Sequence, residues 1–156
     1  MNRVVSMDEI VPIIKEQLKT DGEVRFTPKG ISMMPLLRSG VDVVTLGKAT
    51  FPLKKYDIAL YQRDTGEYVL HRVIKVKDGT YTMRGDNQAL AEPGIREDQI
   101  IGVVTKFTHQ GKTYTPDNFN YKVYERMRVY GARPHMKYLK TRRYLGKIKR
   151  KVLKQG

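Results

Sequence analysis

The sequence predicts a mainly β domain, a partly open β-barrel or sandwich, with a short helix before it and a basic helical tail after it. Short apolar runs separated by turn residues recur from residue 23 to residue 107, a spacing typical of all-β sandwiches and barrels. The chain has 156 residues, enough for one domain with a proper core and too few for two ordinary ones.

Charge divides the chain unevenly. Residues 1–120 hold 17 Lys and Arg against 15 Asp and Glu, whereas residues 121–156 hold 13 against one. The sequence therefore indicates three parts: an N-terminal helical segment (1–22), a nearly neutral β domain (23–116) and a basic, tyrosine-rich tail (117–156).

The N-terminal segment predicts an amphipathic helix from Met7 to Leu18. Its apolar residues recur at helical spacing, and Ser6 with Glu9 matches a capping box. Pro12 should start this helix later or kink it. Charged residues interrupt the apolar positions, so we expect neither a cleavable signal peptide nor a membrane-spanning helix. This favours a location in the cytoplasm or at the inner membrane face.

The β region is marked by alternating apolar residues and by turns. Asp78-Gly79 is a strong two-residue hairpin signal, and Asp64-Thr65-Gly66 and Gln110-Gly111 read as further turns. Strands are expected near residues 24–26, 42–46, 57–61, 67–76, 80–84, 100–107 and 113–114. The chain has no cysteine, which removes disulfides, thiolate metal sites and a cysteine nucleophile, and nothing in it calls for a metal or cofactor.

The tail predicts two helical pieces separated by a break at residues 131–134. Five of the ten tyrosines lie in it among Lys and Arg residues. Amphipathic tyrosines with many cations favour contact of residues 121–154 with an anionic membrane surface. A solvated helix or a protein-binding helix remains the alternative, and nucleic acid is the least favoured partner.

Three short motifs contain residues that could perform chemistry. Ser32 lies in Gly30-Ile31-Ser32-Met33-Met34-Pro35, His71 lies in the longest predicted strand, and Gly85-Asp86-Asn87 precedes Glu92. A serine hydroxyl becomes a nucleophile when a nearby base takes its proton. Taken singly, the three motifs are equally compatible with a turn, a packed histidine and a loop.

In this order and spacing, the motifs together with residues 40–44 and 101–104 resemble the signal peptidase I family. The resemblance covers residues 23–107 and implies that Ser32 is the nucleophile and His71 the general base. Most bacterial members have a lysine at the position of His71, so the chain looks like the endoplasmic-reticulum and archaeal branch. The best match for the third, acidic residue is Glu92, with Asp86 as the runner-up.

The resemblance also implies how a substrate would bind. A peptide or leader peptide would add as a β-strand and be cut after small residues, near Gly30, Met33 and Pro35. The Ser32 backbone N–H would be one oxyanion donor. Some relatives add a hydroxyl two positions before the serine, where this chain has Gly30.

Two other functions fit the sequence. The fold could be a catalytically idle scaffold that acts through its basic tail. It could also be related to the LexA-type self-cleaving repressors, which share this fold. Against the second stand the absence of a helix-turn-helix before the β domain and the presence of His71 where those proteins use lysine.

Overall fold

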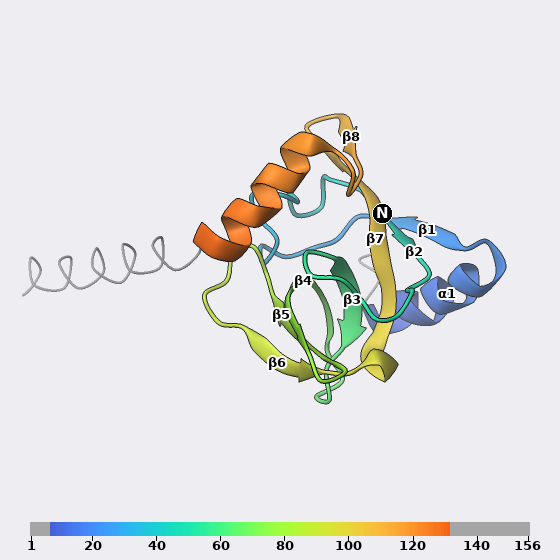
Figure 1. The fold of residues 1–156 in the computed structure, drawn as a ribbon. Helices are drawn as coiled ribbons and strands as arrows, with labels where there is room; N and C mark the ends of the chain where they lie inside the picture. Colours follow the sequence, from blue (N-terminus) through green and yellow to red (C-terminus); the bar gives the residue numbers. More distant parts are fainter. Residues whose placement is uncertain (1–6, 132–156) are drawn as a thin grey trace, which may run out of the picture.

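The computed structural model describes residues 7–131 (Figure 1). Its order of elements is α1 (Met7–Thr20), β1 (Glu23–Phe26), β2 (Val44–Gly47), β3 (Ile58–Gln62), β4 (Tyr68–Lys77), β5 (Thr80–Arg84), β6 (Glu92–Ile95), the short 3₁₀ helix η1 (Glu97–Gln99), β7 (Ile100–His109) and β8 (Lys112–Tyr114). A C-terminal helix over residues 119–131 follows.

The strands form one antiparallel sheet of eight strands. Its order is β1-β2-β7-β3-β4-β5-β6, and β8 pairs with β7. The prediction of a mainly β domain with a helix at each end is confirmed. The sheet does not close into a barrel, because β1 and β6 lie at opposite ends of the strand order.

Most predicted strands form close to their expected bounds, but β6 was not expected. Its sequence, Glu92-Pro93-Gly94-Ile95, contains two residues that are poor strand formers, and Gly94 has a φ of +82°. The helix predicted from Met7 is confirmed and continues to Thr20; of the two effects expected of Pro12, a later start is wrong, since the helix runs through this residue. The predicted cap Ser6 and the second helical piece of the tail lie outside the described residues.

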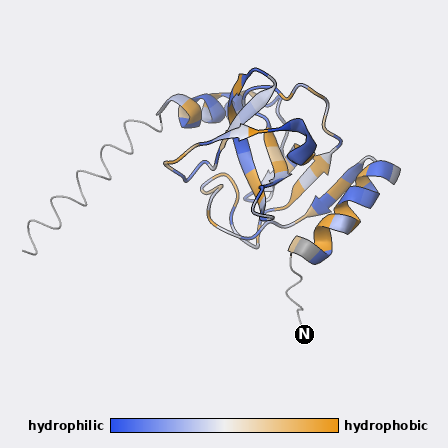
Figure 2. Ribbon diagram, turned by 90° about the horizontal axis from the view of Figure 1, so that it is seen from below, coloured by the Kyte–Doolittle hydropathy of each residue, from blue (hydrophilic) through white to orange (hydrophobic). Residues whose placement is uncertain are grey.

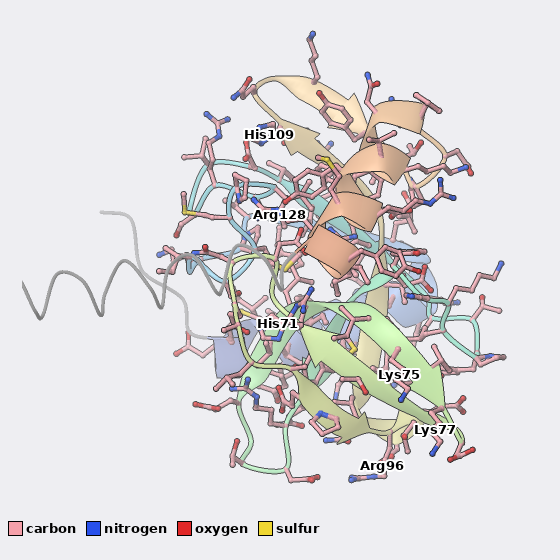
Figure 3. All side chains as sticks on the ribbon, turned by 60° about the vertical axis from the view of Figure 1, so that its left-hand side comes forward. His71, Lys75, Lys77, Arg96, His109 and Arg128 are labelled. Carbon is pink, nitrogen blue, oxygen red and sulfur yellow. The ribbon has the colours of Figure 1, made fainter. Side chains whose placement is uncertain are left out.

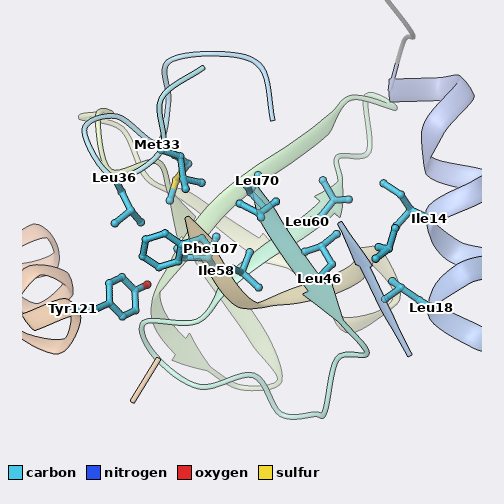
Figure 4. Close-up of a cluster of buried hydrophobic side chains, with 14 residues drawn as sticks. Ile14, Leu18, Met33, Leu36, Leu46, Ile58, Leu60, Leu70, Phe107 and Tyr121 are labelled. Atoms are coloured by element: carbon cyan, nitrogen blue, oxygen red, sulfur yellow. The ribbon is translucent and has the colours of Figure 1, made fainter. Parts of the chain in front are cut away.

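The central strand β3 is buried on both faces. Alternate residues of a strand point to opposite faces, so Ile58 and Leu60 enter one cluster and Ala59 and Tyr61 enter the other. The first cluster is the larger and is drawn in Figure 4. Both faces of the sheet are therefore covered in its middle.

Both helices complete the first cluster. Ile14 and Leu18 of α1 pack at one end of it, and Tyr121 of the C-terminal helix packs at the other end (Figure 4). Hydrophobic and hydrophilic residues alternate around α1, as expected for a helix with one face on the sheet (Figure 2). Within residues 7–131, no helix is long and apolar enough to cross a membrane.

Candidate active site

Ser32 lies in the long connection between β1 and β2. The Met34 N–H donates to the Ile31 carbonyl oxygen at 3.2 Å, and the Leu37 N–H donates to the Met33 carbonyl oxygen at 3.1 Å. These bonds make a tight turn, and the side chains of Met33 and Leu37 are buried in the first cluster. The turn is therefore anchored to the core by these two side chains, while the Ser32 side chain stays half-buried at the surface of the domain.

The backbone conformation just before Ser32 depends on Gly30. Its φ of +108° is in a region that other residues rarely adopt. Its N–H donates to Ser39 Oγ at 2.9 Å, and the Gly40 N–H donates to the Pro28 carbonyl oxygen at 3.0 Å. These two hydrogen bonds thus join the segment before Ser32 to the segment after it.

The predicted Gly85-Asp86-Asn87 motif meets the serine loop directly. The Asn87 N–H donates to the Ser32 carbonyl oxygen at 2.8 Å, and Asn87 Nδ2 donates to the Ile31 carbonyl oxygen at 3.1 Å. Asn87 therefore holds both the peptide group that precedes Ser32 and the one that follows it.

Gly85 is the point where the serine and histidine motifs meet. A Cβ atom at Gly85 would lie 2.6 Å from the Ser32 carbonyl oxygen and 3.1 Å from His71 Nε2. Only a residue without a side chain leaves room for both groups. The Ser32 backbone, in the β1–β2 connection, and the His71 ring, on β4, thus approach the same point.

His71 is on β4 and only 2% exposed, well inside the fold (Figure 3). Its Nδ1 lies 3.1 Å from the Tyr61 hydroxyl, and that hydroxyl donates to Glu92 Oε2 at 2.8 Å. Tyr61 has one proton to give and a carboxylate can only accept it. His71 Nδ1 must then donate to the Tyr61 oxygen, and Nε2 is left as the basic nitrogen.

His71 Nε2 remains accessible. It makes no hydrogen bond with any residue of the described chain, and no buried side-chain nitrogen or oxygen there lacks a partner. The small exposed part of His71 therefore includes Nε2. The Ser32 hydroxyl likewise forms no hydrogen bond within residues 7–131, a common state of catalytic groups before substrate binds.

Glu92 is fixed by Arg63 as well as by Tyr61. Arg63 Nε lies 2.9 Å from Glu92 Oε1, and Arg63 Nη2 lies 2.9 Å from Oε2. Partial burial disfavours the charged form of Glu92, but these hydrogen bonds outweigh it and hold its pKa below the usual value. Glu92 is therefore ionised at neutral pH.

The environment strongly favours neutral His71. Burial, and after it the nearby charge of Arg63, together lower the pKa of His71 to about 4, against the opposite effects of Glu92 and Asp86. Burial and the hydrogen bond to Glu92 raise the pKa of Tyr61, so its hydroxyl stays protonated. At neutral pH the hydrogen-bonded series His71–Tyr61–Glu92 thus has one arrangement of protons: neutral His71 with its proton on Nδ1, protonated Tyr61 and ionised Glu92.

Asp86, the other candidate acid, makes no hydrogen bond to His71. Its carboxylate binds the buried Arg72 through two hydrogen bonds, at 2.8 Å to Nε and 2.7 Å to Nη2. Tyr124 of the C-terminal helix donates to the same carboxylate at 3.1 Å. Asp86 therefore joins β4 to the C-terminal helix and leaves the orientation of His71 to Tyr61 and Glu92.

A small cavity of about 110 Å³ lies beside Ser32. Gly30, Met33 and Ser32 line one side of it, and residues 68–70 of β4 line the other. Its volume is well below the roughly 300–1,000 Å³ typical of ligand pockets. Pro35, the remaining predicted site residue, lines a separate cavity against the C-terminal helix.

The edge of β4 beside this cavity is open. The Val73 N–H bonds to the Asp57 carbonyl oxygen, so in a regular antiparallel ladder odd-numbered residues of β4 bond toward β3. The backbone groups of Tyr68 and Leu70 then point the other way. Pairing of β4 with β5 begins only at Arg72, so no strand of the described chain covers them.

Tyr61 and Arg63 were not anticipated from the sequence. In the register of β3 with β4, Tyr61 lies opposite Val69, diagonal to His71 on the same face. That proximity depends on strand pairing, which the sequence alone does not reveal. Alternation within residues 57–61 would have indicated only that Tyr61 and Ala59 share a face.

No protein-family model matches the chain, and no curated protein matches it. Among residues 7–131, no three His, Asp or Glu side chains are arranged to hold a metal ion. Any assignment of activity must therefore rest on the geometry around Ser32 and His71.

Proposed function

We propose that this protein is a serine endopeptidase of signal-peptidase type, which cleaves a leader or signal-like peptide after small residues. Ser32 is the nucleophile and His71 the general base. The observation that carries the proposal is the close approach at Gly85, where the Ser32 backbone and His71 Nε2 lie within 3.1 Å of one point. The fixed tautomer of His71 supports it, because the free nitrogen is the one near Ser32.

The residues suffice for acyl transfer. His71 Nε2 takes the Ser32 hydroxyl proton as Oγ attacks the peptide carbonyl carbon, and then gives that proton to the leaving amine. Water, deprotonated by the same nitrogen, attacks the acyl-enzyme and releases Ser32. Glu92 acts through Tyr61, which keeps the Nδ1 proton of His71 in place.

The oxyanion formed during attack needs hydrogen-bond donors. The Ser32 N–H is available, because it donates to no group of the described residues. Gly30 contributes no side chain. Loss of one such donor typically costs about 2.7–4 kcal/mol of transition-state stabilisation, so we expect slow turnover unless the substrate-bound enzyme recruits another.

The open edge of β4 suits a peptide bound as an added strand. The free backbone groups of Tyr68 and Leu70 would pair with the peptide beside Ser32. The small cavity on the same side limits the side chain that can enter, which agrees with cleavage after small residues.

The test is labelling of the purified chain with a fluorophosphonate probe, together with cleavage of a peptide library rich in Ala-X-Ala. The chain contains three serines, Ser6, Ser32 and Ser39, so the labelled site can be identified by mass. Ser32→Ala and His71→Ala should abolish both activities. Ser39→Ala, in the same connection as Ser32, and His109→Asn, at the end of β7, are the controls and should keep them. Labelling that survives Ser32→Ala would refute the proposal, and a wild type that is neither labelled nor able to cleave the library would favour the idle scaffold.

A further inference from the structure

The C-terminal helix exposes a continuous apolar stripe. Phe119, Val123, Met127 and Tyr130 follow one another at intervals of four, four and three residues, which puts them on one face of a helix. Their side chains are between 42% and 77% exposed. Four large apolar residues in one row are unusual for a solvent-facing helix, where single exposed hydrophobics are the norm.

The opposite face of this helix is firmly attached. The Tyr121 hydroxyl accepts from Arg72 Nη1 at 2.8 Å, and the Arg128 carbonyl oxygen accepts from Arg84 Nη2 at 2.8 Å. Tyr124 is bound to Asp86. The orientation of the helix is thus set by these contacts, and the four stripe residues are left exposed on its other face.

Cations border the stripe. Lys122 and Arg126 lie on the helix next to it, and Lys55 Nζ lies 4.6 Å from the centre of the Tyr130 ring. The acidic residue of the helix, Glu125, is buried on the inner face, 3.8 Å from Arg72. Residues 126–156 contain no Asp or Glu in the sequence.

We propose that this face of the C-terminal helix docks on an anionic lipid bilayer. An apolar helix face bordered by Lys and Arg is the composition that lies in a membrane interface, with its apolar side chains among the acyl chains and its cations at the headgroups. The strong positive charge selects an anionic surface. Nucleic acid would satisfy that charge but would leave Phe119, Val123 and Met127 in water.

Docking would bring the Ser32 region close to the membrane. Tyr124 of the helix is bound to Asp86, and the next residue, Asn87, donates a hydrogen bond to the Ser32 carbonyl oxygen. The proposal itself does not depend on catalysis and can be tested on the Ser32→Ala protein.

The experiment is sedimentation of the full chain with vesicles of phosphatidylcholine alone and of phosphatidylcholine mixed with phosphatidylglycerol. Wild type should bind the mixed vesicles only. The affinity of the double variant Val123→Gln, Met127→Gln should fall by a factor of roughly ten or more, since it loses the apolar contact without changing charge. Ile13→Gln is the matched control: Ile13 is as exposed as Met127, at 58% against 62%, but lies on α1. It should bind like wild type.

A second pair of variants separates charge from apolar contact. Lys122→Gln and Arg126→Gln should each weaken binding by roughly fivefold at low salt. Thermal melting checks that every variant is folded. Equal binding of wild type and the Val123, Met127 double variant would overturn the proposal, and so would binding of single-stranded nucleic acid or an acidic protein in place of the mixed vesicles.

Discussion

The substitution Gly85→Ala tests the meeting of Ser32 and His71 most directly. Its added methyl group would lie 2.6 Å from the Ser32 carbonyl oxygen and 3.1 Å from His71 Nε2. The first distance is impossible without movement, and the oxygen belongs to backbone that Asn87 holds in place. The φ of Gly85 is not in the left-handed region, so lack of space is the only obstacle.

Relief of this clash requires a shift of several tenths of an ångström or more between the serine loop and the histidine. Inserting a methyl group into a packed site typically costs about 1–3 kcal/mol of stability. A misplacement of about 1 Å can lower a catalytic rate about 100-fold. We therefore expect Gly85→Ala to fold with reduced stability and to be labelled by a fluorophosphonate about 100-fold more slowly.

Gly102→Ala is the matched control. Its added methyl group would lie 3.0 Å from the Gly47 carbonyl oxygen and 3.0 Å from Leu18 Cδ1, in the core between β2, β7 and α1. It should lose a similar amount of stability in urea unfolding while its labelling rate changes by less than about twofold. If Gly85→Ala is labelled as fast as Gly102→Ala, the reasoning that links Gly85 to the reacting groups is refuted.

Three further predictions concern the tautomer of His71, its effect on stability, and the comparison of the two candidate acids. Tyr61→Phe should lower the labelling rate by about 10²–10⁴-fold, because the His71 Nδ1 proton loses its acceptor and moves to Nε2; ¹⁵N NMR of the imidazole would report an unchanged tautomer if this is wrong. His71 has its native pKa at about 4, below the unfolded value of about 6.5, so the folded state binds fewer protons between these values and loses roughly 3 kcal/mol of stability as pH falls from 6.5 to 4. Urea unfolding at both pH values should reveal a smaller loss in His71→Asn, and an equal loss would contradict the assignment. Asp86→Asn should destabilise the fold by about 3–5 kcal/mol, since buried Arg72 loses the nearer of its two charge partners. Glu92→Gln, at a half-exposed ion pair, should cost less than about 1 kcal/mol yet slow labelling more than Asp86→Asn does, if that variant is folded.

The sequence was sufficient for the parts of the molecule that depend on local pattern. Alternating apolar residues located the strands, and the resemblance singled out Ser32 and His71, which the fold brings together. Prediction from the sequence fails where a contact depends on strand pairing. Tyr61 reaches His71 because of the β3–β4 register, and no spacing along the chain encodes that diagonal.

The two candidate acids illustrate the same limit. Asp86 and Glu92 are both carboxylates close to the Gly85 turn in sequence, and composition does not rank them. Their partners follow from the pairing of the strands. Asp86 forms an ion pair with Arg72, which lies on the opposite face of β4 from His71. Strand β6, in contrast, brings Glu92 to Tyr61 and Arg63. β6 itself was missed because Pro93 and Gly94 obscure its strand character.

The last prediction follows from how Arg63 acts on the base. Its charge holds Glu92 in place but also lowers the pKa of His71, so the site gains a fixed tautomer at the expense of basicity. A weaker base gives less driving force for taking the Ser32 proton. Arg63→Gln removes the cation and leaves the Glu92 charge less compensated, and both changes should raise the pKa of His71. The acid limb of the labelling rate, expected near pH 4 in wild type, should then move to higher pH. Lys75→Gln, on the exposed end of the same strand as His71, is the control and should leave the profile in place (Figure 3). A profile that does not move in Arg63→Gln would mean that burial alone sets the pKa of His71.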